Sequence, residues 1–444
     1  MRSGWKLLSA GTVLIAVCLT GEFAVAQEGL LLSGVGPINR AMGGASTAAP
    51  VDASGALHWN PASIMGLQQS ELEFGVELLY PQPTLGSSVG AGALGGGIPP
   101  VSLSGSTDSN SGVFAIPTVG FVYRPKEEPW ALGLGVFGIG GFGTNYQGGT
   151  VTNPILSPGA PNGIGLGPMY SKLQIVQIAP TFAYQLTDRL SFGIAPTITA
   201  ADLSLDPNFL SSPNDANANG FFSYPSGTHG RTTWGYGVQA GLYLTTENCW
   251  NFGASIKSPQ WMQTFHWSGA NELGQPVDVR THFDLPLVAS LGASYTGFDR
   301  WLLAIDGRYF DYGSTQGFDT TGFDATGAVA GLGWRSIFSV AAGAQYQATD
   351  SLALRLGYVW NQNPIPDSNT FFNVISPNIL MHTISCGFSY QLTPSWLVSF
   401  AYLHAFENSA SGPWYAPGIG ALPGTSVTNR VSADALTAGL TVKF

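Results

Sequence analysis

The chain is short of charged residues. Asp, Glu, Lys and Arg make up 9% of its 444 residues, against about 25% in ordinary soluble proteins. A soluble protein of this length would cover itself with such side chains, so we expect much of this surface to face another solvent. The 26 acidic residues outnumber the 16 basic ones, and this balance argues against a nucleic-acid partner.

Long apolar runs are also missing. Beyond the first 26 residues, no run approaches the ~20 apolar residues of a membrane-spanning helix. The start of the chain is typical of a secretory signal, with Arg2 and Lys6 before an apolar stretch and the small-residue cleavage motif Ala24-Val25-Ala26. We expect residues 1–26 to be removed, so that the exported mature chain begins at Gln27.

No catalytic or metal-binding pattern stands out. The six histidines have no metal-ligand spacing, and the sequence has no glycine-rich nucleophile elbow and no phosphate loop. We therefore expect no enzyme, no cofactor and no metal, although dispersed residues leave a hydrolase open as an alternative. The histidines are His58, His229, His266, His282, His382 and His404.

What the chain does contain is a repeated turn. Six segments consist of a tyrosine, a few polar residues and then Leu or Trp, and alternating sequence flanks each of them. After the fifth turn, apolar residues occupy every second position from Leu352 to Trp360. Such a period of two, with one apolar and one mixed face, indicates strands between two environments. The turns are residues 123–130, 184–190, 243–250, 295–301, 346–352 and 390–396.

The turns also give the number of strands. Six turns join twelve strands, one more strand (residues 72–80) precedes them and one (residues 436–444) follows. The total of fourteen is even, as bacterial outer-membrane barrels require, and only a closed barrel satisfies the backbone of every strand in a membrane. We predict an all-β fold, a 14-stranded antiparallel transmembrane β-barrel over residues 70–444, in the bacterial outer membrane. A secreted β-sandwich or propeller would explain the turns but not the few charges.

The segment before the barrel, residues 27–69, does not alternate. It is rich in small residues and ends in Asn60-Pro61-Ala62. It could be a surface tail, but its Leu, Ile, Met and Trp content favours burial as a compact hatch in the barrel lumen. It is too short to be the globular plug of an energised transporter.

At this point the sequence resembles the FadL/TodX family of outer-membrane transporters of long-chain fatty acids and hydrophobic compounds, over the whole mature chain. The G-x-x-R-A-x-x-G-x-A stretch of residues 36–45, which contains Arg40, and Asn60-Pro61-Ala62 are similar to the family's hatch. Residues 355–358 with 364–367, Ser258-Pro259 and Leu285-Pro286 are similar to its barrel motifs. The resemblance implies ligand capture at outer loops and sideways release into the membrane through a kink in the third strand.

The third strand, residues 130–144, is where that kink would lie. Gly138, Gly140 and Gly141 crowd its outer half, and glycine inside a strand marks a bulge or a close backbone approach. The alternative is that these glycines have no special role and reflect the high glycine content of the whole chain. By parity, Phe137 and Ile139 should point inward and line an apolar path or pack on the hatch.

Two outer loops carry apolar clusters. The first, residues 206–230, holds Phe209, Leu210, Phe221 and Phe222, and the second, residues 260–282, holds Trp261 and Phe265. Exposed apolar side chains of this kind bind a hydrophobic ligand or pack on each other to cap the barrel. In the family, the corresponding loops form the capture site.

Three lumen cations, Lys257, Arg308 and Arg355, could meet the carboxylate of a fatty acid. Pairing that fixes the hatch, to which Arg40 would also contribute, is the simpler interpretation, because buried charges need partners. The available carboxylates are Glu71, Glu73, Glu77, Asp306 and Asp434.

Together these features predict passive uptake of long-chain fatty acids or similar hydrophobic compounds. The alternatives are uptake of aromatic hydrocarbons by the same route, or a general porin or structural barrel. The expected partners are the hydrophobic small molecule, outer-membrane lipid and, because the chain ends in Phe444, the barrel-insertion machinery. We expect a monomer.

Overall fold

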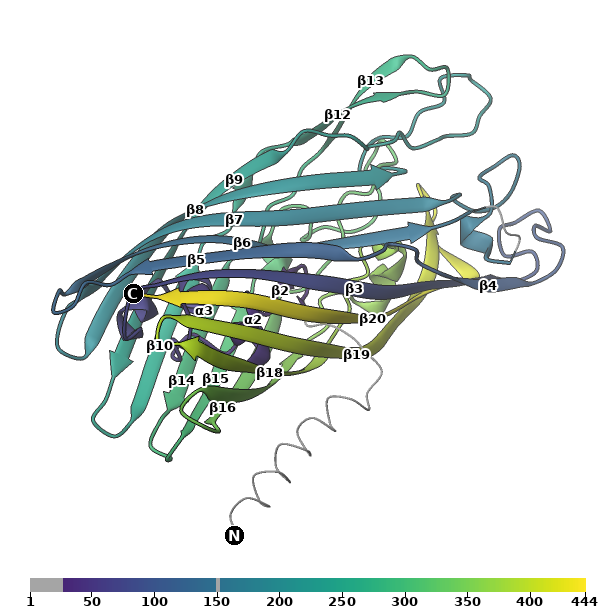
Figure 1. The fold of residues 1–444 in the computed structure, drawn as a ribbon. Coiled ribbons are helices and arrows are strands. Elements are labelled where there is room, and N and C mark those ends of the chain that lie inside the picture. The colour runs from purple at the N-terminus through teal and green to yellow at the C-terminus, as the bar shows by residue number, and fades with distance from the viewer. Residues whose placement is uncertain (1–26, 149–151) are drawn as a thin grey trace, which may run out of the picture.

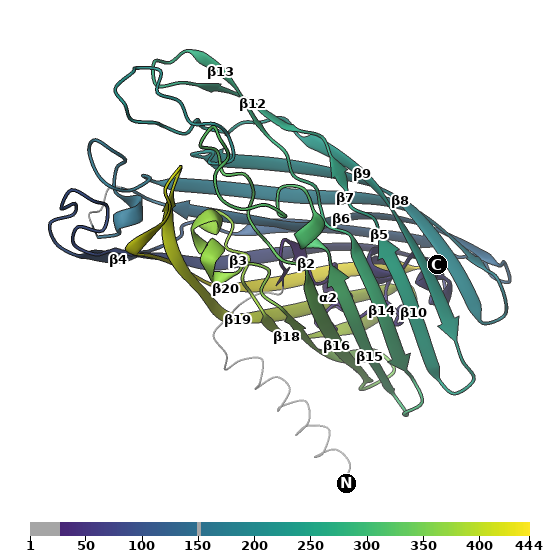
Figure 2. The same ribbon diagram turned by 180° about the vertical axis from the view of Figure 1, so that it is seen from behind.

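The computed structural model describes residues 27–148 and 152–444, so the expected signal peptide lies outside the described residues. Within them, fourteen strands form one closed antiparallel barrel, which Figures 1 and 2 show from opposite sides. In order, they are β3 (Glu71–Val89), β5 (Phe114–Tyr123), β6 (Trp130–Tyr146), β7 (Met169–Gln185), β8 (Leu190–Asp206), β9 (Thr233–Thr245), β10 (Trp250–Lys257), β14 (Val288–Tyr295), β15 (Trp301–Phe310), β16 (Ile337–Gln347), β17 (Leu352–Asn361), β18 (His382–Thr393), β19 (Trp396–Ala416) and β20 (Gly420–Lys443).

The last strand closes the barrel on the first. β20 pairs with β3 from Thr425↔Val89 to Lys443↔Glu71. Each of the six predicted turns joins two neighbouring strands, beginning with β5 to β6 and ending with β18 to β19. The prediction of a 14-stranded barrel from the turn repeat is therefore confirmed.

Alternation along the strands separates two environments. On β3, Phe74, Val76 and Leu78 are exposed on the outer face, while Glu73 and Glu77 are buried inside. Outward apolar and inward polar side chains are the pattern of a barrel in lipid. The expectation that Asp434 lies in the lumen was wrong, because this residue is on the outward-facing side of β20.

The side chain of Asp434 accepts hydrogen bonds from Gln82 Nε2 (3.3 Å) and Tyr402 Oη (3.3 Å). Both partners lie on neighbouring strands of the wall, and none of the three belongs to the hatch. Asp434 therefore does not fix the hatch. It has the same parity as the outward-facing Leu436, and side chains two residues apart on a strand point to the same face.

Residues 27–69 lie inside the barrel. They form β1 (Gln27–Glu28), β2 (Leu31–Leu32), α2 (Pro37–Ala41), α3 (Ala53–Trp59) and the 3₁₀ helix η1 (Pro61–Gly66), and α2 and α3 are seen within the ring of strands in Figure 1. The small residues allow tight packing: a Cβ at Gly44, which has φ +82°, would lie 1.7 Å from Ser33 O. We refer to residues 27–69 as the hatch.

Asn60 shows how the hatch is attached to the wall. Its side-chain amide donates to Thr47 O (2.8 Å) and to Leu242 O (2.9 Å) on β9. Its side-chain oxygen accepts from Ala62 N (3.1 Å) and so caps η1, which begins at Pro61. Proline suits this first position because it has no N–H to leave unpaired.

The remaining elements belong to the segments that join the strands away from the six turns, and β4, β12 and β13 are seen at that end of the barrel in Figure 2. They are β4 (Leu103–Asp108), which pairs with the outer part of β3, β11 (Trp261–Met262), the hairpin of β12 (Phe265–Ala270) and β13 (Pro276–Thr281), and the 3₁₀ helices η2 (Pro154–Leu156), η3 (Tyr312–Ser314) and η4 (Asp367–Asn373). Among the described residues, no helix has the length and apolar character needed to cross a membrane.

Candidate functional site

The wall of the barrel is interrupted between β5 and β6. β6 pairs with β5 only as far as Thr118↔Phe137, although both strands continue outward. At the same height, the pairing of β6 with β7 shifts register between Gly138 and Gly140, and Gly141 has φ +149°. A bulge of this kind bends a strand away from its neighbour.

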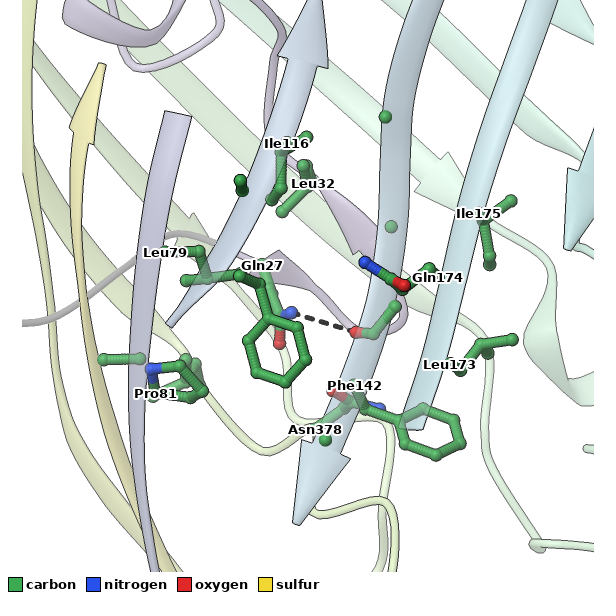
Figure 3. Close-up of a pocket in the computed structure, with 18 of the residues that line it drawn as sticks. Gln27, Leu32, Leu79, Pro81, Ile116, Phe142, Leu173, Gln174, Ile175 and Asn378 are labelled. Carbon is green, nitrogen blue, oxygen red and sulfur yellow. Dashed lines mark hydrogen bonds between the residues drawn. The ribbon is translucent and has the colours of Figure 1, made fainter. Parts of the chain in front are cut away.

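A cavity of about 80 Å³ fills this interruption (Figure 3). We call it the wall cavity. Its lining includes lumen-facing Leu79 as well as Ala115 and Pro117, which face outward. Both faces of the wall therefore contribute to its lining. Its further lining includes Ile116, Gly138, Gly140, Gly141, Phe142 and Val176.

The start of the hatch pairs with the bulge. Leu31 of β2 is aligned with Gly140, Gly141 N donates to Leu30 O (3.1 Å), and Gln27 Nε2 donates to Gly141 O (3.2 Å). A Cβ at Gly140 would lie 2.5 Å from Leu30 O, so only glycine allows the two backbones this close. We refer to β1 and β2 as the N-terminal hairpin.

Two further cavities lie between the wall cavity and the outer surface. The outer groove, about 600 Å³, is lined by Phe209, Phe222, Tyr224, Phe323, Phe372 and Tyr415. The loop cavity, about 230 Å³, is lined by Phe142, Leu173, Leu210, Phe283, Phe318 and Leu332.

The three cavities share lining residues. Asp324 and Val329 line both the outer groove and the loop cavity. Phe142 and Leu173 line both the loop cavity and the wall cavity. Mostly apolar surface therefore runs from the loops, through the upper lumen, to the interruption in the wall.

Some of the predicted capture residues line these cavities and others do not. Phe209 and Phe222 line the outer groove and Leu210 lines the loop cavity. Phe265 is buried behind Phe283, with ring centroids 4.8 Å apart. Phe221 lines none of the three cavities, and the exposed Trp261 is aligned with the outward-facing Tyr236.

Several lining residues were missing from the sequence interpretation. Phe318 and Phe323 come from the long segment after η3, and Phe371 and Phe372 come from η4. The Phe371-Phe372 pair is an apolar cluster in an outer segment, so the argument used for the loop of residues 206–230 could have identified it.

Phe137 and Ile139 both point inward, and both are buried against the hatch. The ring of Phe137 meets His58 edge-on, with centroids 5.8 Å apart. Ile139 lines a small cavity of about 20 Å³ beside α3, which we call the lower cavity. Its lining also includes Leu31, Leu32, His58, Trp59, Lys257 and Phe310.

Arg308 is the centre of a buried ionic network. It donates to Glu28 of the N-terminal hairpin (3.1 Å) and to its strand neighbour Asp306 (3.0 Å). It also donates to Ser33 O (3.2 Å) and Gly44 O (2.6 Å) in the hatch. Burial raises the pKa of Glu28, while the charge of Arg308 opposes this shift.

Trp59 and Asp306 complete this network. The guanidinium carbon of Arg308 lies 3.4 Å from the ring centroid of Trp59, a cation–π contact. Asp306 accepts from the backbone N–H groups of Ser46 (2.9 Å) and Thr47 (3.0 Å). Arg308 thus fastens three parts of the hatch to the wall.

The other lumen cations differ in their partners. Arg40 makes a bidentate pair with Glu77, with both N···O distances 2.6 Å. Arg355 donates to Gln345 (2.7 Å) and Ser389 (2.6 Å). Lys257 donates to Gln177 Oε1 (3.0 Å) and, within the described residues, forms no ion pair.

Within residues 27–148 and 152–444, no group of three or more His, Cys, Asp and Glu side chains is arranged to hold a metal ion. His58 lies buried in the hatch beside Lys257. Burial, with smaller contributions from the charges of Lys257, Arg308 and Arg40, holds the pKa of His58 well below its usual range. The ring is therefore neutral at ordinary pH.

Comparison with known proteins agrees with this architecture. Residues 20–444 match the model of a family described as outer membrane protein transport protein (OMPP1/FadL/TodX). No curated protein matches the sequence.

Three solved structures are similar over nearly their whole length. The toluene transporter TodX of P. putida is 17% identical, with 93% of this chain and 99% of that chain covered and a TM-score of 0.69. The toluene transporter TbuX of Ralstonia pickettii is 18% identical, with 93% of this chain and 99% of that chain covered and a TM-score of 0.66. A FadL homologue of Pseudomonas aeruginosa is 15% identical, with 94% of this chain and 99% of that chain covered and a TM-score of 0.68. At such identities the similarity shows the fold.

Proposed function

The chain belongs to the OMPP1/FadL/TodX family of outer membrane transport proteins, and we propose that it takes up hydrophobic small molecules by passive lateral transport. A ligand binds in the outer groove, moves through the loop cavity into the wall cavity, and leaves sideways between β5 and β6 into the membrane. The hatch keeps the lumen closed below this path.

The observation that carries the proposal is the continuity of the three cavities, which share Asp324 and Val329 at one junction and Phe142 and Leu173 at the other. A general porin needs an open polar lumen, whereas here the hatch occupies the lumen and the upper path is mostly apolar. This contrast supports a transporter of hydrophobic molecules over a porin.

The driving force is burial of the ligand. Each methylene group that leaves water contributes about 0.8 kcal/mol, so a long acyl chain gains more in the outer groove than a small hydrocarbon. Release into the membrane keeps the chain in apolar surroundings. Uptake then follows the gradient of the ligand and needs no coupled energy source.

Long-chain fatty acids are the ligands we propose first, and aromatic hydrocarbons are the second candidate. The rings of Phe209 and Tyr224 lie 5.0 Å apart, and those of Phe372 and Tyr415 lie 4.8 Å apart. Such a groove also suits an aromatic ligand, because edge-on and offset ring contacts are favourable. TodX and TbuX are both described as toluene transporters.

The test is uptake of radiolabelled oleate and toluene by cells that express the full chain, compared with cells that carry an empty vector. We expect the expressing cells to accumulate oleate faster, because the apolar path offers an acyl chain a route that avoids water. Normal insertion is checked by the heat-dependent gel mobility of the folded barrel.

A deletion of residues 27–35 serves as the companion variant. It removes the N-terminal hairpin, which pairs with the β6 bulge, and should alter the uptake rate while the barrel still inserts. If the inserted wild-type protein accelerates uptake of neither oleate nor toluene, the proposed function is wrong.

A further inference from the structure

Three carboxyl groups gather at the start of α3. Asp52 caps the helix, and Glu71 and Glu73 project inward from β3, which packs against it. Gly55 N donates to Asp52 Oδ2 (3.4 Å) and Ser54 N donates to Glu73 Oε2 (3.3 Å). None of the three acidic residues is more than 3% exposed. Three buried carboxylates side by side would be costly, because burial and mutual repulsion both disfavour the charged form.

No cation neutralises this group directly. Within residues 27–148 and 152–444, none of the three carboxyl groups forms an ion pair. Two cations act from a greater distance, Arg355 of β17 on Asp52 and Glu73 and Lys443 of β20 on Glu71. The guanidinium of Arg355 is bonded instead to neutral side chains on the strands beside it.

The other elements that pack on α3 add no positive charge to the group. β5, β6 and η1 contain no charged residue. Lys172, the one charged residue of β7, is on the outward-facing side of that strand. Arg40 of α2 is paired with Glu77, and His58 lies at the opposite end of α3. The group therefore carries more negative than positive charge unless it binds a proton.

The side chains of Asp52 and Glu73 are arranged to share a proton. In each, one oxygen accepts from the helix, while the other, Asp52 Oδ1 or Glu73 Oε1, accepts from no donor among the described residues. The two side chains are nevertheless hydrogen-bond neighbours. Two ionised carboxylates cannot bond to each other, because both only accept, whereas a protonated one donates. One shared proton therefore gives both side chains a partner and removes one negative charge.

The acidity of Asp52 agrees with a shared proton. Burial raises its pKa from the ordinary 3.8 to about 6, although the charge of Arg355 opposes this shift. A loosened hatch would let water reach Asp52 and return its pKa toward the ordinary value, so the packed hatch binds the proton more tightly. The stabilisation that the proton gives is complete below about pH 4 and is lost as the pH rises from there through about 6.

We propose that Asp52 and Glu73 form a proton-operated latch between the hatch and the barrel wall. With one shared proton, the pair holds the start of α3 against β3, and the hatch seals the lumen. Without that proton, two facing carboxylates repel each other, α3 loosens from β3, and the lumen beneath the transport path becomes permeable to ions. The latch concerns the seal of the lumen, so it goes beyond the proposed function and does not depend on the ligand.

The test is the pH dependence of ion conductance. The purified mature protein is inserted into planar lipid bilayers, and the conductance per barrel is recorded at about pH 5 and about pH 8 in the same salt. About one pH unit separates pH 5 from the pKa of about 6, and each unit changes the opening equilibrium about tenfold. We therefore expect the wild type to conduct about 10-fold more at pH 8 than at pH 5.

Two variants each replace one carboxyl group by an amide, which donates a hydrogen bond at every pH. Asp52→Asn keeps the helix cap, because Asn and Asp cap about equally well, and Glu73→Gln keeps the length of its side chain. Both should stay sealed at pH 8, with a conductance close to that of the wild type at pH 5. Glu128→Gln makes the same replacement at an exposed position in the turn between β5 and β6 and should show the full wild-type rise.

Three outcomes would overturn the latch. The first is an equal wild-type conductance at the two pH values. The second is a rise that persists in both Asp52→Asn and Glu73→Gln. The third is a high conductance of both variants already at pH 5, because an amide that cannot replace the protonated carboxyl points to a purely structural role. None of these outcomes bears on oleate uptake, which tests the transport function separately.

Discussion

Replacing Ile116 by tryptophan should slow uptake about tenfold or more while the barrel inserts normally, because the larger ring occupies the wall cavity that the ligand must pass, and a barrier raised by ~1.4 kcal/mol slows a step tenfold. The side chain of Ile116 projects into the wall cavity (Figure 3). A larger ring at this position narrows the passage between β5 and β6. Initial rates of oleate uptake by expressing cells measure the effect.

The matched control is Ile305→Trp. Ile305 lies on the lipid-facing side of β15 and is 52% exposed, so its replacement adds the same ring to the barrel without entering a cavity. The control should take up oleate at the wild-type rate. Equal rates for the two variants would mean that the ligand does not pass through the wall cavity.

Replacing Arg308 by methionine should destabilise the hatch by about 3–5 kcal/mol, because it leaves buried carboxylates without their cation. The charges of Glu28 and Asp306 would remain in the lumen, and the cation–π contact with Trp59 would be lost. We expect a lower urea midpoint for the mature protein in lipid vesicles. We also expect a higher ion conductance in planar bilayers, because a loosened hatch no longer seals the lumen.

Neutralising the whole network is the control for that loss. The triple variant Glu28→Gln, Asp306→Asn, Arg308→Met removes the carboxylates together with the cation, and replacing a complete buried ionic group is far less costly than breaking it. It should recover most of the urea midpoint. If Arg308→Met alone unfolds at the wild-type urea concentration, Arg308 does not hold the hatch.

The barrel could be predicted from the sequence because its strands lie between two different solvents. Phe74, Val76 and Leu78 alternate with Glu73 and Glu77, and the same period recurs between repeated turns. Lipid outside and a polar lumen inside enforce that period over the whole strand. The same period places Asp434 on the outer face with Leu436, so its expected place in the lumen was wrong although the alternation could have shown it.

The position of the irregularity in β6 could be predicted from the sequence, but the segment that pairs with it could not. The run of glycines marked the outer half of β6, where the register shift between Gly138 and Gly140 occurs. Residues 27–32 show no alternation, so nothing in the sequence aligned Leu31 with Gly140. Their contact depends on how the hatch packs against the whole barrel.

The candidate site was only partly predictable for the same reason. Phe209 and Leu210 were identifiable as apolar residues on an outer loop, and they line two of the cavities. The difference between Arg308 and Lys257 could not be predicted, because the carboxylate that pairs with Arg308 lies 280 residues away in the sequence. Which of the lumen cations pair with a carboxylate is a property of the tertiary structure.

The most direct test of lateral transport is to locate a ligand on its route. Crystals of the mature protein soaked with a fatty acid that carries bromine at the end of its chain would show the bromine by anomalous scattering. The proposed route predicts a bromine peak in the wall cavity, between Ile116 of β5 and Phe142 of β6. Peaks that continue from the loop cavity past the hatch toward the turn end of the barrel, with none in the wall cavity, would contradict it.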